Sequence, residues 1–305
     1  MEGKPQILEH ASESLPLTLH DTRQGAGLAL RAEARGESAL HSGTFGASSL
    51  ADRHLAAGDA AGRLQLWDLE RLAAPFASVQ AHASAVNRVD GSGGQADAAV
   101  AAFEPASADQ ARDCWAVAFG DAHCDTERCV AAGYDNGDVK LFCLRTNRLR
   151  WGAALGDGVC GLQFDRRDIA MNKLVATCLE GRCHVFDMRT QHPQEGFAST
   201  AEGVEKGATL WCVAHLPQNR DVWALTGGDG SVSLYRYRYP DQRFMKVGKG
   251  VARGVAGSVE RIAERGLSTQ PLTALDWSPD KLGLFCCTAL DQTLRVGFAT
   301  KLHLL

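Results

Sequence analysis

The sequence predicts an all-β protein, a β-propeller with seven blade slots, two of which are incomplete. Three observations lead to this expectation. A strand–turn–strand pattern recurs five times along the 305 residues, a shorter strand pattern precedes most of the copies, and the chain has almost no helical periodicity. One such unit cannot bury its two apolar faces alone, so repeated units must cover one another by stacking around an axis.

Each hairpin copy consists of an apolar strand ending in small residues, a short turn, and a strand in which apolar and polar residues alternate. In the copy AAGYDNGDVKLFC, Asn136 and Gly137 tolerate the positive φ of a tight turn. The first copy ends in the dipeptide Trp67-Asp68, which is typical of WD-repeat propellers. The five copies begin at His54, Cys129, Leu174, Trp223 and Phe285.

A third strand, with the pattern apolar-x-x-apolar-x-aromatic, precedes most of the hairpins. We expect it to form the inner strand of each blade, next to the axis of the ring. The pattern is clear in CWAVAF, VCGLQF and LTALDW, and looser in LWCVAH and VNRV. These five segments begin at Cys114, Val159, Leu272, Leu210 and Val86.

These patterns make residues 1–305 one propeller domain. Five well-marked blades are expected at about 50–80, 112–150, 157–200, 208–245 and 270–300, and two incomplete slots at about 15–45 and 84–105. The segment after Gly94 consists mainly of small and polar residues and has few β-forming residues, which is typical of a loop. We expect residues 5–10 to form an outer strand beside residues 292–298, so that both termini share one blade.

Charge and hydropathy exclude several classes of protein. The net charge of −4 and the pI of about 6.2 lack the basic excess of a nucleic-acid-binding surface. Basic clusters at 144–151 and 165–168 are interpreted as solvated loops. No apolar run approaches the ~20 residues that span a bilayer, and the first ten residues lack the apolar core of a secretory signal. We therefore expect a soluble intracellular protein that binds neither nucleic acid nor membrane. We also expect it to be cytoplasmic and its propeller to be monomeric.

The ten cysteines include no CxxC pair, so their spacing argues against a metal site. Five of them lie inside apolar segments that are predicted to form strands: Cys143, Cys178, Cys183, Cys286 and Cys287. A buried free thiol packs like a small apolar side chain. We expect these cysteines to be reduced and buried, as in a cytosolic protein.

Catalytic motifs are not evident. The segment GDGVCG, residues 156–161, matches G-x-G-x-x-G, but a further strand follows it where a dinucleotide site requires a helix. There is no G-x-S-x-G elbow and no P-loop, and the histidines have neither metal spacing nor an obvious nucleophile beside them. The sequence therefore predicts a protein that is not an enzyme and that has no cofactor.

Propellers mostly act by binding, through the loops at the two ends of the ring. Trp115 and Trp211 occupy corresponding places near the start of two inner strands, and Asn87, Cys160 and Thr273 are their equivalents in other blades. Exposed tryptophan is a favoured interface anchor. We predict partner binding at Trp115, Trp211, Asn87 and Thr273. The alternative is that both tryptophans pack between blades as core.

A second binding motif is FDMR, Phe186 to Arg189. It resembles the box by which some propellers dock as substrate receptors on a cullin ubiquitin ligase, with Phe in place of Trp. Arg189 is the residue on which such docking would depend. The alternative interpretation is the ordinary end of a blade strand.

Longer non-repeat stretches carry a family resemblance. CWAVAFG, AGYDNGDVKLF, QFDRRDIAMNKLVATCLEGRCHVFDMRTQHPQEGFAS, HLPQNR, GVAGSV and LSTQPLTALDWSPDK together resemble the Monad family, WD-repeat proteins counted among the cytoplasmic assembly factors of axonemal dynein. GKPQI near the start and SGTFGASSL at 42–50 fit as well. The resemblance covers about two thirds of the chain and is dense from 112 to 300.

The resemblance implies a seven-bladed ring without enzymatic activity. It also implies partnership with a prefoldin-like co-chaperone complex that contains AAA+ ATPases, with dynein heavy chains as clients. The chain departs from the family at two places. After Asp21 it lacks a further strand-forming segment that the family has, and after Gly94 it lacks a hairpin segment that the family has. We therefore expect a non-enzymatic scaffold in dynein arm assembly, with the cullin-ligase receptor as the alternative.

Overall fold

The structure is a computed structural model, which describes residues 6–14, 18–21, 29–34, 36–46, 48, 53–92, 102–203, 207–246 and 252–305. Strands dominate it, as expected. Helical structure in these residues is limited to two short 3₁₀ turns, Ala108–Gln110 and Leu302–Leu304. Neither comes near the length and apolarity that a membrane-crossing helix needs.

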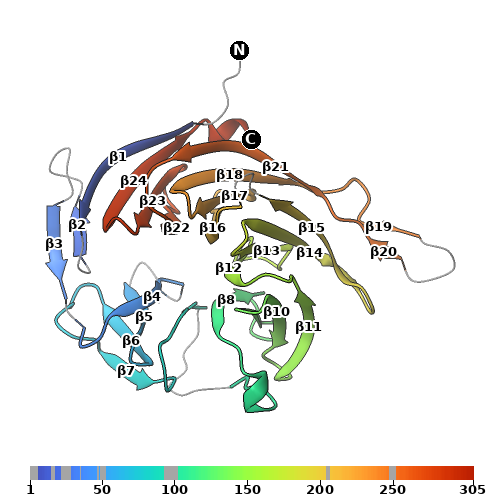
Figure 1. The fold of residues 1–305 in the computed structure, drawn as a ribbon, viewed down its shortest axis with the longest axis horizontal. Coiled ribbons are helices and arrows are strands. Elements are labelled where there is room, and N and C mark those ends of the chain that lie inside the picture. The colour runs from blue at the N-terminus through green and yellow to red at the C-terminus, as the bar shows by residue number, and fades with distance from the viewer. Residues whose placement is uncertain are drawn as a thin grey trace.

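Five four-stranded antiparallel sheets surround a central axis, the arrangement of a five-bladed β-propeller (Figure 1). From the inner to the outer strand, the first contains β4 (Leu40–Thr44), β5 (His54–Asp59), β6 (Arg63–Asp68) and β7 (Ala77–Gln80). The second contains β8 (Cys114–Gly120), β9 (Cys129–Tyr134), β10 (Asp138–Cys143) and β11 (Arg148–Ala154). The third contains β12 (Val159–Phe164), β13 (Lys173–Cys178), β14 (Arg182–His192) and β15 (Gly196–Gly203).

The fourth and fifth sheets complete the set, together with two short ribbons. The fourth contains β16 (Leu210–Leu216), β17 (Asn219–Gly227), β18 (Ser231–Arg238) and β21 (Ser258–Gly266). The fifth contains β22 (Leu272–Trp277), β23 (Leu284–Ala289), β24 (Thr293–Thr300) and β1 (Gln6–Ser14). The ribbons pair β2 (Thr18–Asp21) with β3 (Ala29–Glu33), and β19 (Phe244–Met245) with β20 (Arg253–Gly254).

The hairpin turns have the backbone conformation that the sequence predicts. Gly62, Gly137, Gly181 and Gly230 have φ between +74° and +86°, where a side chain would be strained. The fifth hairpin has Gln292 at the corresponding turn, with φ of 65°. At Gly137 a Cβ atom would also lie 2.6 Å from the backbone nitrogen of Asp157, so this turn is closely packed on the next sheet.

Apolar side chains fill the spaces between neighbouring sheets. The inner strands β8, β12, β16 and β22 are successive neighbours around the axis. Leu141 and Leu174 belong to the core between the second and third sheets, Val185 and Trp223 to the core between the third and fourth. Between the fourth and fifth sheets the core includes Trp277, Phe285 and other buried side chains. The second to fifth sheets are thus covered by their neighbours, as the repeat requires, whereas among the described residues the buried cluster of the first sheet contains no residue of another four-stranded sheet.

The two termini of the chain share one sheet, as predicted. Strand β1 pairs antiparallel with β24, with Ile7 opposite Ala299 and Leu8 opposite Phe298. The N-terminal segment therefore supplies the outer strand of a blade whose other three strands are the last in the chain (Figure 1). This pairing links the first residues of the ring to the last.

Two strand positions differ from those expected. Strand β4, at residues 40–44, is the inner strand of the first complete sheet, although these residues were assigned to an incomplete slot. The outer strand of the fourth sheet is β21, at 258–266, because the β19–β20 ribbon is inserted after residue 243. A period-2 pattern cannot reveal such an insertion, because a short inserted ribbon has the same alternation as an outer strand.

The inner strand expected at Val86–Val89 is wrong, because residues 85–92 contain no strand. This segment nevertheless connects the first two sheets. The amide of Val86 donates to the carbonyl of Asp59 at 3.0 Å, and the Asn87 side chain donates to the carbonyl of Cys114 at 3.2 Å. The Asp90 carboxylate accepts a hydrogen bond from the amide of Phe119 at 2.9 Å. The segment therefore occupies the slot without forming a sheet.

All ten cysteines are free thiols. Cys178, Cys183 and Cys287 are buried as predicted, Cys143 is partly buried, and Cys286 is exposed. The expectation for Cys286 was wrong because successive residues of a strand point to opposite faces, and its neighbour Cys287 takes the buried one. Burial raises the pKa of Cys178 to about 12.

Candidate functional site

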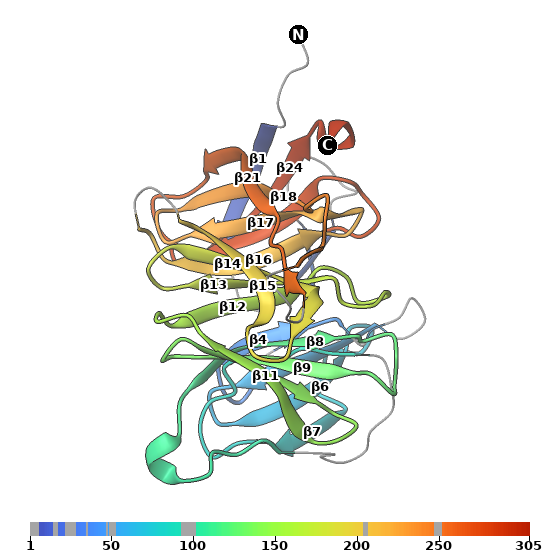
Figure 2. The same ribbon diagram turned by 90° about the vertical axis from the view of Figure 1, so that its right-hand side faces the viewer.

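The strands of each sheet alternate in direction, so the turns between them lie at two opposite edges, which form the two rims of the ring. We call the upper rim the edge at which β8, β12, β16 and β22 begin and at which the β9–β10, β13–β14, β17–β18 and β23–β24 turns lie. The lower rim is the edge at which the same inner strands end. In Figure 2 the strands run across the view, so the rims lie at its left and right sides.

The structure brings the predicted residues of the upper rim onto neighbouring strands. Trp115, Cys160, Trp211 and Thr273 are each the second residue of an inner strand, and these strands are successive neighbours. Asn87 is attached to the start of β8 through its hydrogen bond to the carbonyl of Cys114. These positions therefore form one arc along the upper rim.

Their exposure differs from member to member. Trp211 is 36% exposed and Asn87 is exposed, whereas Trp115 and Thr273 are partly buried and Cys160 is buried. Neither tryptophan belongs to the buried clusters between sheets. Thr273 also contacts Thr288, with 3.2 Å between the hydroxyl oxygens. The arc thus presents aromatic surface to solvent, and its role in partner binding stays a prediction.

Trp115 lies against the next sheet without being enclosed by it. A Cβ atom on Gly158 would lie 3.1 Å from Cζ3 of Trp115, 2.9 Å from Cδ1 of Leu179 and 2.8 Å from the carbonyl oxygen of Asp135. The missing side chain at Gly158 therefore lets the indole lie close to the backbone at the start of β12. Leu179 extends the same apolar surface.

Arg189, the residue singled out in FDMR, lies toward the lower rim and is held by groups of the fold. Its guanidinium donates two hydrogen bonds to the Asp187 carboxylate, at 2.8 and 2.6 Å, and stacks 4.0 Å from the ring centroid of Tyr239. Asp187 is fully buried. A bidentate, stacked arginine of this kind is a strong structural contact. The cullin-docking role of Arg189 stays a prediction.

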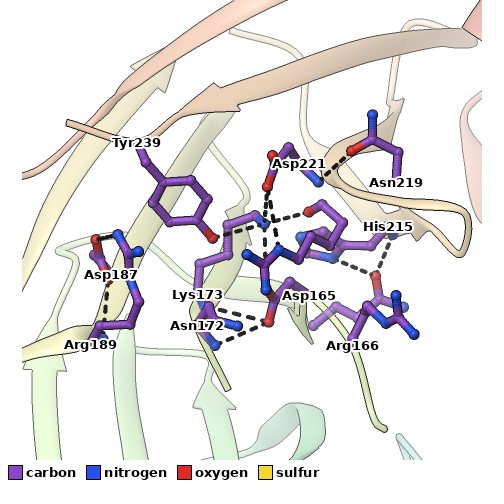
Figure 3. A network of polar contacts seen from close by, with 12 residues as sticks. Asp165, Arg166, Asn172, Lys173, Asp187, Arg189, His215, Asn219, Asp221 and Tyr239 are labelled. Carbon is purple, nitrogen blue, oxygen red and sulfur yellow. Dashed lines mark hydrogen bonds and ion pairs between the residues drawn. The ribbon is translucent and has the colours of Figure 1, made fainter. Parts of the chain in front are cut away.

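A polar network near Arg189 joins the third and fourth sheets (Figure 3). Its centre is Lys173, the first residue of β13, whose side chain has no exposed surface. The Lys173 ammonium nitrogen lies 3.6 Å from carboxylate oxygens of both Asp165 and Asp221. It also donates to the carbonyl of Arg220 and lies 3.5 Å from the Tyr239 hydroxyl. The network thus links the β12–β13 loop to the first residues of β17.

Burial sets the protonation behaviour of this network. It lowers the pKa of the Lys173 ammonium group, while the carboxylates of Asp165 and Asp221 oppose that shift. Burial, together with the nearby charge of Lys173, lowers the pKa of His215 well below its usual value. The His215 amide donates to Oε1 of Gln163 at 2.6 Å, which joins β16 to β12. Because the Lys173 amine is fully enclosed, the arrangement acts as a clamp between blades.

Sequence reasoning missed this clamp. Residues 165–168 were interpreted as a solvated loop, which holds for Arg166 and Asp168 but is wrong for Asp165, whose side chain is fully buried. The signal available was a lysine at the start of a strand whose other five residues are all buried and apolar or small. Among the described residues, no group of three or more His, Cys, Asp or Glu side chains is arranged to hold a metal ion.

Comparison with curated proteins finds full-length relatives. Dynein axonemal assembly factor 10 of Chlamydomonas reinhardtii is 48% identical over 354 residues, which cover 99% of this chain and 99% of the relative. The proteins of the same name from Bos taurus and Homo sapiens are 46% and 44% identical, each over 351 residues and 98% of both chains.

The chain belongs to the dynein axonemal assembly factor 10 family. No family model matches it. Because the alignment to the Chlamydomonas relative spans 354 residues and this chain has 305, about 50 positions have no residue of this chain opposite them. That length is close to one WD repeat of ~40–45 residues.

Proposed function

We propose that this chain is a non-enzymatic scaffold in the cytoplasmic preassembly of axonemal dynein arms. The observation that carries the proposal is the identity of 48% over 99% of both chains with a relative named as a dynein axonemal assembly factor. In this role the chain acts with a prefoldin-like co-chaperone complex that contains AAA+ ATPases, and it holds dynein heavy chains as clients.

The fold supports a scaffold because it offers a rigid disc with two wide rims. Three apolar cores and the Lys173 clamp join successive sheets. Trp115 and Trp211 lie on the upper rim, outside those cores. Exposed aromatic side chains on a rigid surface are favourable anchors, because little conformational entropy is lost when they are covered. We assign client or co-chaperone binding to this rim, with the chain as a monomer.

The seven-bladed WD-repeat ring of the family is part of the proposal. Five four-stranded sheets, the β2–β3 ribbon and the strandless segment at 85–92 agree with five complete slots and two incomplete ones. The roughly 50 positions without a counterpart here, about one WD repeat in length, agree with strands missing from those slots.

The test is affinity purification of the tagged full-length chain from ciliating cells, with mass spectrometry of the captured proteins. We expect dynein heavy chains and AAA+ co-chaperones among them. A parallel purification with Trp115→Ala should lose these partners while the melting temperature of the purified chain changes little. Capture of cullin adaptors in place of dynein chains would refute the proposal and favour docking through Phe186–Arg189.

A further inference from the structure

Four acidic residues of two adjacent blades lie on the segments next to Trp115 on the upper rim. The amide of Asp135 donates to the carbonyl of Asp113 at 3.0 Å, so the β9–β10 turn lies beside the approach to β8. The carboxylate of Asp157 accepts from the amide of Glu180 at 2.7 Å, which joins the approach to β12 with the β13–β14 turn. Gly158, directly after Asp157, lies against Asp135 and the Trp115 indole. We call Asp113, Asp135, Asp157 and Glu180 the acidic arc.

None of the four carboxylates of the acidic arc lies in an ion pair within the described residues. The basic residues nearest to them in the chain are Arg112, beside Asp113, and the exposed Arg182, two residues after Glu180. Two other acidic residues of the upper rim are paired, Asp138 with Lys140 and Asp291 with Arg295, whereas the exposed Asp229 accepts hydrogen bonds from Ser231. Arg112, next to Asp113 in the chain, donates instead to the carbonyls of Asp109 and Ala111. Clustered like charges of this kind produce a negative potential that attracts cations.

Trp115 adds a second element of recognition. Its ring lies within the arc, beside Leu179, and is only partly buried. The face of an indole attracts ammonium and guanidinium groups through its quadrupole, and among aromatic side chains it does so best. The methylene stems of lysine and arginine pack on the apolar surface that Leu179 provides. A cation with a long apolar stem therefore matches the site better than a metal ion or a small polar molecule.

Charges on the lower rim of the second to fourth sheets are mostly paired, in contrast to those of the acidic arc. Arg145 pairs with Glu127, Arg166 with Asp168, Arg167 with Asp90 and Arg220 with Asp221. This rim therefore offers less uncompensated negative charge to a basic partner than the acidic arc does.

We propose that the acidic arc and Trp115 bind a lysine- or arginine-rich segment of a protein partner. The inference rests on the proposed function, since it names the chemistry of the partner that the upper rim receives. One basic side chain lies over the Trp115 ring, and its neighbours in the segment face Asp113, Asp135, Asp157 and Glu180. The segment is contacted mainly through its side chains, so its exact sequence matters less than its charge.

The test measures binding of a short fluorescein-labelled peptide rich in lysine and arginine to the full-length chain by fluorescence anisotropy. A matched peptide with glutamate at every basic position is the negative probe. We expect the basic peptide to bind and the affinity to fall steeply as salt is raised, because exposed charges are screened. Trp115→Ala should weaken binding at least tenfold, as for an interface anchor.

The double variant Asp113→Asn with Glu180→Gln should weaken binding about fivefold and flatten the salt dependence, since each exposed pair contributes modestly. These two carboxylates are exposed, so the fold does not depend on them. The matched control is Asp241→Asn with Asp280→Asn, which changes the net charge equally at exposed positions of the lower rim. Binding that is equally sensitive to the control, independent of Trp115, or equally strong for the glutamate peptide would overturn the inference.

The two proposals fail separately. If the basic peptide binds as described but dynein heavy chains are absent from the affinity purification, the proposed function is wrong and the basic-segment site stands. If dynein heavy chains are captured but the basic peptide does not bind, or binds independently of Trp115, the proposed function stands and the basic-segment site is wrong.

Discussion

Replacing Lys173 by methionine tests whether the polar clamp between the third and fourth sheets holds the ring together. Methionine has nearly the length of lysine and no charge, so the change removes the ammonium group with little loss of volume. Lys173 and Asp165 have no exposed side-chain surface, and Asp221 is 34% exposed. The substitution therefore leaves one carboxylate buried without its cation.

The magnitude follows from that difference in burial. Removing one partner of a buried ion pair costs about 3–5 kcal/mol, because the other charge stays in a low-dielectric environment. The pair with the partly exposed Asp221 adds at most about 1 kcal/mol. We expect Lys173→Met to lower the free energy of unfolding by about 3–5 kcal/mol, a large share of the ~5–15 kcal/mol typical of folded domains.

Urea denaturation followed by tryptophan fluorescence measures the change, since Trp223 and Trp277 lie in the cores on either side of the fourth sheet. Lys140→Met is the matched control, because Lys140 is 40% exposed and pairs with Asp138 at 3.7 Å on the surface. It should cost about 1 kcal/mol or less. Asp165→Asn in the Lys173→Met background should recover part of the loss. Equal effects of Lys173→Met and Lys140→Met would refute the reasoning.

The other predictions concern four separate features. Arg189→Ala should destabilise the fold measurably in urea, because it leaves a buried carboxylate without its bidentate partner, and it should not create or abolish cullin-adaptor binding in a pull-down. With iodoacetamide under native conditions, mass spectrometry should find Cys124 modified well before Cys178, because hydrogen bonds lower the pKa of the first thiol and burial raises that of the second. The pKa of His215 is lowered in the fold, so the unfolded chain binds more protons than the folded chain below pH 6.5. The melting temperature should therefore fall as the pH drops through that value. His215→Asn should reduce the dependence of the melting temperature on pH. Deletion of residues 1–14 removes β1 and should lower the melting temperature of the whole ring; an unchanged melting curve would contradict the closure seen here.

Much of the fold was predictable because the alternation of apolar and polar residues identifies a blade strand from its own sequence. The alternation of Val139 and Leu141 with polar neighbours gave the strand and its buried face, and both side chains are fully buried in the structure. The turn at Gly137 was predictable because few residues tolerate its φ of 86°. The pairing of the N-terminal segment with β24 followed from the need of the last blade for an outer strand.

The clamp was not predictable, for a physical reason. Lys173, Asp165 and Asp221 are separated in sequence by up to 56 positions, and their association depends on the packing of two blades. A local sequence pattern identifies a strand, but it does not identify which distant residue pairs with a charged side chain. The positions of Trp115 and Trp211 on one arc were predictable only because corresponding residues of repeated units take corresponding places.

The strandless segment at 85–92 shows how one blade slot is bridged with very little chain. The Gln163 side chain accepts the amide of His215, which ties β12 to the next inner strand. Asp90 has the same place in VNRVD that Gln163 has in VCGLQ, and its carboxylate accepts the amide of Phe119 in the next inner strand. Val86, at the first position of the pattern, is buried beside Gly58 as Val159 is buried beside Gly133. The sequence pattern therefore marked a true inner position, although residues 85–92 themselves form no strand. Asp90→Ala should consequently loosen the junction between the first two sheets, seen as faster hydrogen exchange at the Phe119 amide, whereas an unchanged rate would mean that the bridge does not depend on this contact.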